Sequence, residues 1–185
     1  MAETPSKMLP LGTIAPTFEL ADVKSGKKLS LNDLKSNIGT VIMFLCNHCP
    51  YVKHIQRQLV EMADLYQAKG LRFIAISSND AKRYPADGPE KMREEANQHR
   101  YPFPYLYDET QAVARAYQAA CTPDFYLFDK DMKCVYRGRF DGATPGNHVA
   151  VTGADLREAL ECVLNNKPVS QQQIPSLGCN IKWKV

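Results

Sequence analysis

The sequence lacks the features of a membrane protein or a nucleic-acid-binding protein. No apolar run reaches the length that spans a bilayer, and residues 1–10 contain no apolar stretch behind basic residues that would indicate a signal peptide. The net charge is only +3 over 185 residues, with no basic patch interleaved with aromatic residues. We therefore expect a cytoplasmic protein with no membrane and no nucleic-acid partner.

The sequence also lacks a secreted disulfide framework and the second CxxC that a structural zinc site of this kind normally uses. Only Cys46 and Cys49 are closely spaced, and the other four cysteines, Cys121, Cys134, Cys162 and Cys179, are scattered. His48 and His54 complete a metal site on paper, but we expect no bound metal. A lone cysteine in a reducing compartment is most often a small buried hydrophobe.

What the sequence does contain is a CxxC at the junction of a strand and a helix. The apolar run Val41–Leu45 is typical of a buried strand, and apolar residues recur at helical spacing from Val52 until Gly70. The first free N–H groups and the positive end of the helix dipole then face the sulfurs and stabilise a thiolate, the reactive form. This placement predicts a redox dithiol.

The pattern along the chain predicts one domain with an α/β fold. We expect a loose N-terminal arm over 1–10, the domain over 11–165 and a C-terminal tail over 166–185, packed on or near the domain. Ser30 to Asp33 has capping-box spacing for a short helix. Further strands are predicted near 15–22, 28–30, 71–77, 103–107, 125–128 and 134–140, and further helices near 90–99, 110–118 and 154–164.

Several motifs resemble one family. They are Gly12–Leu20, the run Cys46-Asn47-His48-Cys49-Pro50-Tyr51-Val52, Tyr84–Glu90, Cys121–Phe125 and Gly178–Trp183. Together they resemble peroxiredoxin-like thioredoxin-fold proteins with a CxxC, within the alkyl hydroperoxide reductase/thiol-specific antioxidant and bacterial thiol–disulfide exchange superfamily. The resemblance implies a thioredoxin-like three-layer α/β/α fold with a mixed central sheet, an N-terminal β extension and a C-terminal tail.

Two departures from the relatives matter. True peroxiredoxins carry Pro-x-x-x-Thr-x-x-Cys, but counting back from the second cysteine those positions are Ile42 and Cys46, and the peroxidase arginine has no match near Thr122-Pro123. Thioredoxin has a Trp directly before its first cysteine and a buried Asp six residues before it, where this chain has Leu45 and Thr40. The acid for the buried thiol is therefore absent or comes from elsewhere.

A thioredoxin mechanism assigns roles to the pair. Cys46 is expected as the exposed nucleophile and Cys49 as the thiol that resolves the mixed disulfide. His48 is expected to lower the pKa of the first thiolate, unless it is an ordinary solvent-facing histidine. Asn47 and Pro50 complete the residues expected to tune the pair. We predict a disulfide more oxidising than that of thioredoxin, whose reduction potential is about −270 mV.

The resemblance also implies a partner loop, and two of the scattered cysteines are candidates for spare thiols. Pro123 is expected to be cis and to lie opposite the dithiol, where the backbone of Thr122 can pair with an extended substrate segment; an ordinary proline at a strand start is the alternative. Cys121 and Cys179 are possible accessory thiols, with Cys179 reaching the site or a partner chain as a resolving cysteine. Buried packing is the alternative for Cys121.

Three functions remain open at this point. The leading hypothesis is a thiol–disulfide oxidoreductase with no cofactor, acting on disulfide- or thiol-bearing proteins or small molecules, with thioredoxin or glutathione as reductant. The second is a thiol-dependent peroxidase with Cys49 as the peroxidatic cysteine, resolved by Cys46 or Cys179. The third is a metal-binding or redox-sensing module that acts through the CxxC.

Overall fold

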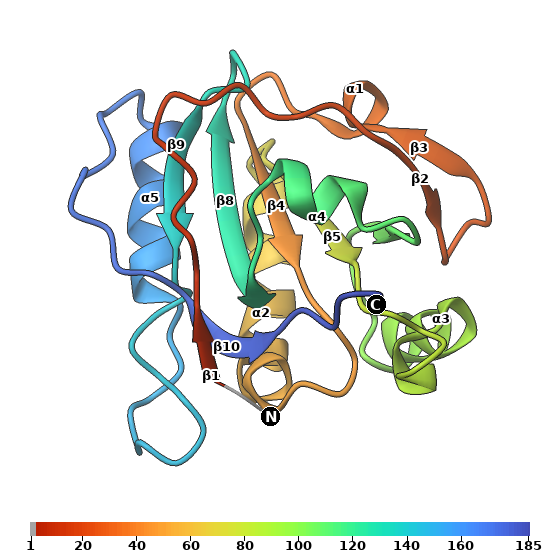
Figure 1. Ribbon diagram of the computed structural model, residues 1–185. Helices are drawn as coiled ribbons and strands as arrows, with labels where there is room; N and C mark the ends of the chain where they lie inside the picture. Colours follow the sequence, from red (N-terminus) through yellow and green to blue (C-terminus); the bar gives the residue numbers. More distant parts are fainter. Residues whose placement is uncertain (1–2) are drawn as a thin grey trace.

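A seven-stranded mixed sheet runs through the middle of the molecule, as the computed structural model of the chain shows (Figure 1). The structure describes residues 3–185. β4 lies inside the sheet, parallel to β5 and antiparallel to β8. In spatial order the strands are β3 (Lys28–Ser30), β2 (Glu19–Asp22), β6 (Tyr105–Tyr107), β5 (Arg72–Ser77), β4 (Gly39–Phe44), β8 (Asp124–Asp129) and β9 (Cys134–Gly138).

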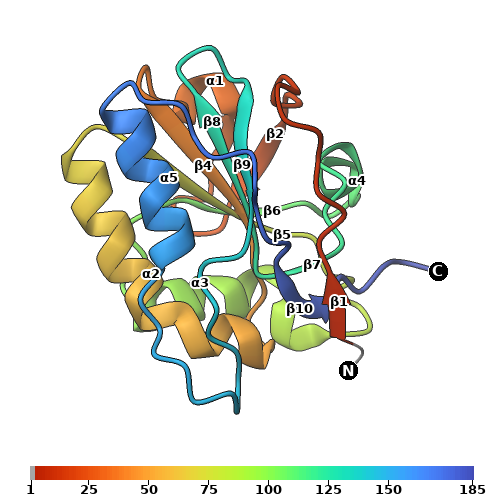
Figure 2. The ribbon, with the colours of Figure 1, turned by 90° about the vertical axis from the view of Figure 1, so that its left-hand side faces the viewer.

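Helices cover both faces of this sheet, with α2 (Pro50–Ala68) and α5 (Ala154–Leu164) on one side and α4 (Ala112–Ala116) on the other (Figure 2). Every residue of β4 is buried, because successive side chains enter opposite layers of the core. Val41 and Met43 pack into the layer with α2 and α5, whereas Ile42 and Phe44 pack into the layer with α4. This is the three-layer α/β/α arrangement with a mixed sheet that the sequence predicts.

Local sequence signals set the helix ends. At the start of α1 the Ser30 hydroxyl accepts a hydrogen bond from the Asp33 N–H, and the Asp33 carboxylate accepts one from the Ser30 N–H, so the predicted capping box is present.

No helix within residues 3–185 combines the length and the apolarity that crossing a membrane requires. The helices are α1 (Leu31–Leu34), α2 (Pro50–Ala68), α3 (Pro89–Gln98), α4 (Ala112–Ala116) and α5 (Ala154–Leu164), with a 3₁₀ turn η1 at Pro85–Asp87.

A strand near each end of the chain joins β7 in a second, three-stranded sheet with the order β1-β10-β7. It joins β1 (Glu3–Pro5), β10 (Leu177–Asn180) and β7 (Cys121–Thr122), all antiparallel. The expectation of a loose arm over 1–10 is therefore wrong at residues 3–5, while residues 1 and 2 lie outside the described part. Short polar strands that pair across almost the whole chain leave no periodic signal in the sequence.

Candidate functional site

The cysteine pair lies where β4 passes into α2. Cys46 follows the strand by two residues, and Cys49 is the N-cap residue of α2, with Pro50 in the first turn of the helix. Pro50 suits that turn because the helix does not need its missing N–H. Both side chains are buried, with 2% of Cys46 and 0% of Cys49 exposed. The expected exposure of Cys46 is wrong, because other segments cover the loop.

The loop Thr122-Pro123 lies against both sulfurs, and its peptide bond is cis as the resemblance implies. The Sγ of Cys46 is 3.3 Å from the Thr122 hydroxyl, and the Sγ of Cys49 lies 3.1 Å from the Thr122 carbonyl oxygen. The sequence separation of about 75 residues is closed by the antiparallel pairing of β8 with β4, which places Asp124 beside Phe44. The predicted partner loop is therefore at the dithiol.

A third thiol completes the cluster. Cys179, on β10, has its Sγ 2.9 Å from the Sγ of Cys49 and is 3% exposed. Cys49 also exchanges a side-chain hydrogen bond with Cys46, so its sulfur has a thiol on two sides. All three cysteines are free thiols in this structure. The structure thus brings together two of the predicted catalytic residues and one predicted accessory thiol.

Cys49 is the cysteine whose thiolate the site stabilises. A hydrogen bond from the Cys46 thiol, with further ones from Cys179 and the Val52 N–H, lowers the pKa of Cys49 to about 5 although burial opposes the shift. The Val52 N–H is one of the free donors of the first turn of α2. An N-cap sulfur also lies at the positive end of the helix dipole. The thiolate at neutral pH is therefore on Cys49.

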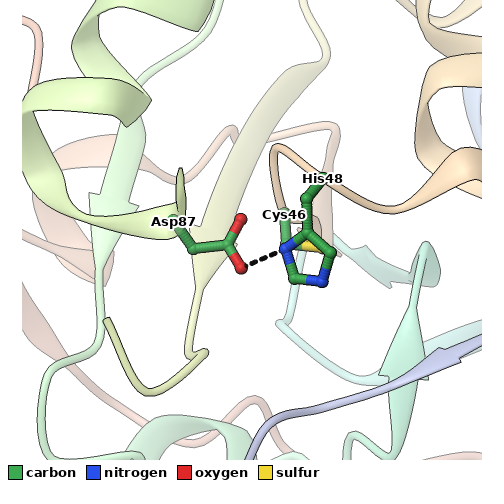
Figure 3. Close-up of side chains that lie close together, drawn as sticks. All are labelled: Cys46, His48 and Asp87. Atoms are coloured by element: carbon green, nitrogen blue, oxygen red, sulfur yellow. Dashed lines mark ion pairs between the residues drawn. The ribbon is translucent and has the colours of Figure 1, made fainter. Parts of the chain in front are cut away.

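Cys46 has the opposite character. Its hydrogen bond to Cys49, its burial and the negative charge of Asp87 all raise its pKa well above the usual value. The expectation that His48 stabilises a Cys46 thiolate is therefore wrong. Figure 3 shows the reason: the His48 ring is directed at Asp87, and its Nδ1 is 2.6 Å from the carboxylate. The same ring stacks on Tyr84.

Asp87 is the functional residue that sequence reasoning missed. Its side chain is completely buried, and its carboxylate accepts hydrogen bonds from the Asn47 N–H and the Asn79 amide, each at 2.8 Å. The Asn47 side chain fixes the same loop, because it donates to the Ala86 carbonyl oxygen at 2.7 Å. Asp87 supplies the buried acid near the thiols, for which the residues before Cys46 offer no candidate, and its only signal was its place in the Tyr84–Glu90 motif.

The other cysteines lie outside this cluster. Cys121 on β7 is fully buried, and burial raises its pKa far above the usual value, so it has the character of a packing residue. Its thiol contacts the Pro123 carbonyl oxygen at 3.8 Å. Cys134 is buried in β9, and Cys162 is half-buried on α5. Neither Cys134 nor Cys162 is among the residues described above as contacting Cys46 or Cys49.

The loop also contains a possible set of metal ligands. The sulfur of Cys46, a ring nitrogen of His48 and a carboxylate oxygen of Asp87 all lie within 4.8 Å of one another (Figure 3). His54, considered above as a ligand, is not part of this group. Two of the three side chains already pair with each other, and the thiol is held protonated, so a metal would have to displace a proton.

An apolar cavity of about 230 Å³ lies beside Pro123. Its wall includes the rings of Tyr51 and Phe140 and the side chain of Leu177. None of the three sulfurs lines it. The cavity can therefore hold an apolar group next to the dithiol loop, but it does not expose the thiols.

Comparison with known proteins agrees with this fold. The AhpC/TSA family matches residues 11–137, and the chain belongs to that family. No curated protein matches it. The chain is similar to an uncharacterized conserved protein of Geobacillus kaustophilus, with 56% identity, TM-score 0.98 and coverage of 100% of this chain and 97% of the other.

Two further solved structures are informative. A hypothetical protein of Sinorhizobium meliloti is 45% identical, with TM-score 0.96 and coverage of 98% and 99% of the two chains. A putative thiol:disulfide interchange protein DsbE of Chlorobium tepidum has 23% identity, TM-score 0.64 and coverage of 85% and 99%. This last likeness shows the thioredoxin fold alone.

Proposed function

We propose that this member of the AhpC/TSA family is a thiol–disulfide oxidoreductase that uses Cys46 and Cys49 as its dithiol. The observation that carries the proposal is the contact between a Cys49 thiolate at the start of α2 and a protonated Cys46 thiol, both facing Thr122-Pro123. Substrates are disulfide- or thiol-bearing proteins or small molecules, and a thiol such as glutathione or thioredoxin returns the reduced form.

We infer that the two cysteines act in the reverse of the order expected from the sequence, because the site stabilises the thiolate of Cys49 and not that of Cys46. The Cys49 thiolate attacks one sulfur of a substrate disulfide and forms a mixed disulfide, while the other substrate sulfur leaves as a thiolate. Cys46 then attacks Cys49, its proton passes to the substrate sulfur that departs, and the Cys46–Cys49 disulfide remains. The hydrogen bond to Cys49, burial and the negative charge of Asp87 together keep Cys46 protonated until that step.

A thiol-dependent peroxidase is the second candidate, and the low pKa of Cys49 favours it. A thiolate at a helix N-terminus can attack a peroxide oxygen and become a sulfenic acid, which a neighbouring thiol converts to a disulfide with release of water. Against it, Cys46 occupies the position where true peroxiredoxins keep threonine. That threonine helps to hold the peroxide.

Two assays on four proteins separate these candidates. Reduction of insulin disulfides and consumption of hydrogen peroxide are measured for the wild type, Cys46→Ser, Cys49→Ser and the control Cys162→Ser. We expect insulin reduction by the wild type and by Cys162→Ser, and its loss in both CxxC variants. Peroxide turnover that survives in Cys46→Ser but not in Cys49→Ser, without insulin reduction by the wild type, would overturn the proposal.

A further inference from the structure

Strand β10 occupies the backbone edge beside the dithiol. It pairs antiparallel with β7, with Cys179 opposite Thr122 and Asn180 opposite Cys121. Figure 2 shows β7, β10 and β1 together. An extended segment that adds to a strand edge is held by such main-chain hydrogen bonds, and its side chains then enter fixed positions. Here the segment comes from the chain itself, and the side chain at the Thr122 position is a cysteine.

The contact between β10 and the loop requires a glycine. A Cβ added at Gly178 would lie 2.0 Å from the Thr122 carbonyl oxygen and 3.2 Å from the Pro123 nitrogen. Any other residue would push the strand away, because Cβ atoms do not approach backbone atoms that closely. Gly178 therefore sets the depth at which β10 lies on the loop.

Contacts on both sides hold the strand in place. β1 pairs with the other edge of β10, with Glu3 opposite Cys179. Beyond β10 the Lys182 N–H donates to the Asn79 side chain at 2.8 Å, and the Asp80 N–H donates to the Lys182 carbonyl oxygen at 2.9 Å. Asn79 also binds Asp87, so the tail and the CxxC loop share an anchor.

The result is a sealed cluster of three sulfurs with Cys49 between two partners. At most 3% of the surface of each side chain is exposed. Cys179 touches Cys49 at 2.9 Å, and burial together with its hydrogen bond to Cys49 raises the pKa of Cys179 to about 12. Cys179 is thus a protonated thiol in contact with the reactive thiolate, as Cys46 is.

We propose that Cys179 is a third redox-active cysteine, presented by β10 where a substrate cysteine would bind, and that it forms a disulfide with Cys49 that alternates with Cys46–Cys49. In this exchange the Cys179 sulfur attacks Cys49 within the Cys46–Cys49 disulfide. The Cys49–Cys179 bond forms, the Cys46–Cys49 bond breaks, and the proton lost by Cys179 passes to Cys46. No electrons enter or leave.

This inference rests on the proposed dithiol function and adds a substrate constraint to it. An external polypeptide that pairs with Thr122 competes with β10 for the same edge. A protein substrate therefore binds through an extended cysteine-containing segment that replaces β10.

The first experiment traps the new disulfide in the full chain. Trypsin leaves Cys162 and Cys179 on one peptide, because Lys167 precedes a proline, so the background is Cys162→Ser. Cys46→Ser/Cys162→Ser protein is treated with oxidised glutathione, and its disulfides are mapped by mass spectrometry without reduction. Cys49 attacks the glutathione disulfide, Cys179 resolves the adduct, and two molecules of reduced glutathione are released.

We expect a near-stoichiometric Cys49–Cys179 link. Cys49 that stays glutathionylated beside a free Cys179 overturns the inference. The proposed dithiol is tested separately by formation of Cys46–Cys49 in Cys162→Ser/Cys179→Ser protein, so either proposal can fail without the other.

A backbone variant tests the role of the strand. The substitution Gly178→Ala is added to the Cys46→Ser/Cys162→Ser protein. Its Cβ must move residue 178 away from the Thr122 carbonyl oxygen by about 1 Å. A displacement of this size can slow formation of the Cys49–Cys179 disulfide on the order of a hundredfold. Gly142→Ala is the matched control, since its Cβ would meet no atom closer than 3.6 Å. Slower Cys49–Cys179 formation only in Gly178→Ala supports the inference, and equal rates in both variants contradict the presentation by β10.

Discussion

Removal of the Cys46 thiol should raise the pKa of Cys49. The hydrogen bond from Cys46 is the largest contribution that holds this pKa at about 5. A hydrogen bond to a charged group contributes about 1.5–3 kcal/mol, and one pKa unit corresponds to about 1.4 kcal/mol. Cys46→Ala is therefore expected to move the pKa of Cys49 to between about 6 and about 7.

The assay is the ultraviolet absorbance of the thiolate in the fully reduced protein as a function of pH. It needs no reagent to reach a buried sulfur. The wild type should lose one thiolate as the pH falls through about 5, and Cys49→Ser should lack this step. Cys121→Ala is the control, because no hydrogen bond joins Cys121 to Cys49. In this variant the midpoint of the Cys49 titration should stay unchanged. A low-pH step that persists in Cys49→Ser and disappears in Cys46→Ala would refute the assignment of the thiolate to Cys49.

Further predictions follow from the same charges. The folded-state pKa of Cys49 is depressed from 9.0 to about 5, so its contribution to the stability of the reduced protein is present above pH 9 and lost as the pH falls to 5. In denaturant unfolding, the free energy of unfolding of the wild type should fall by about 2.7 kcal/mol more than that of Cys49→Ser between pH 8 and pH 6. Equal pH slopes in the two proteins would contradict the depressed pKa of Cys49. Asp87→Asn should lower the pKa of Cys46, seen as a shifted second step in the thiolate titration; an unchanged step would contradict the electrostatic role of Asp87. The same variant should lose about 1–3 kcal/mol of unfolding free energy, because amide donors of Asn47 and Asn79 lose a buried carboxylate; a loss well below this would contradict the anchoring role.

Local patterns were enough to predict the scaffold of the site. The apolar run before Cys46 and the helical spacing after Pro50 place the CxxC at a strand–helix junction, as the structure has it. The capping box at Ser30 was predictable for the same reason, since its partners are three residues apart. The partner loop at Thr122-Pro123 came from the family resemblance rather than from any local pattern.

The charges of the site could not be predicted because they depend on distant segments. The sequence places His48 beside both cysteines, but only the fold shows that Asp87 binds its ring. A histidine that was expected to stabilise the Cys46 thiolate is instead paired with the carboxylate that opposes it. The proposed order of attack of the two cysteines therefore differs from the order expected from the sequence.

The position of the C-terminal tail could not be predicted for the same reason. Cys179 was a candidate for the site, but its register opposite Thr122 depends on the pairing of β10 with both β7 and β1. Strands of two to four residues show too little periodicity in the sequence to predict such pairing. The close approach of Gly178 to the loop is likewise visible only in three dimensions.

The most direct test of the central claim is a redox titration of Cys179→Ser protein in glutathione buffers, with differential alkylation of each cysteine. We predict that Cys46 and Cys49 are oxidised together, as one two-electron couple, at a potential above about −270 mV, because the low pKa of Cys49 stabilises the reduced form. Cys49 that is glutathionylated while Cys46 remains a free thiol, or a potential at or below about −270 mV, would contradict the account.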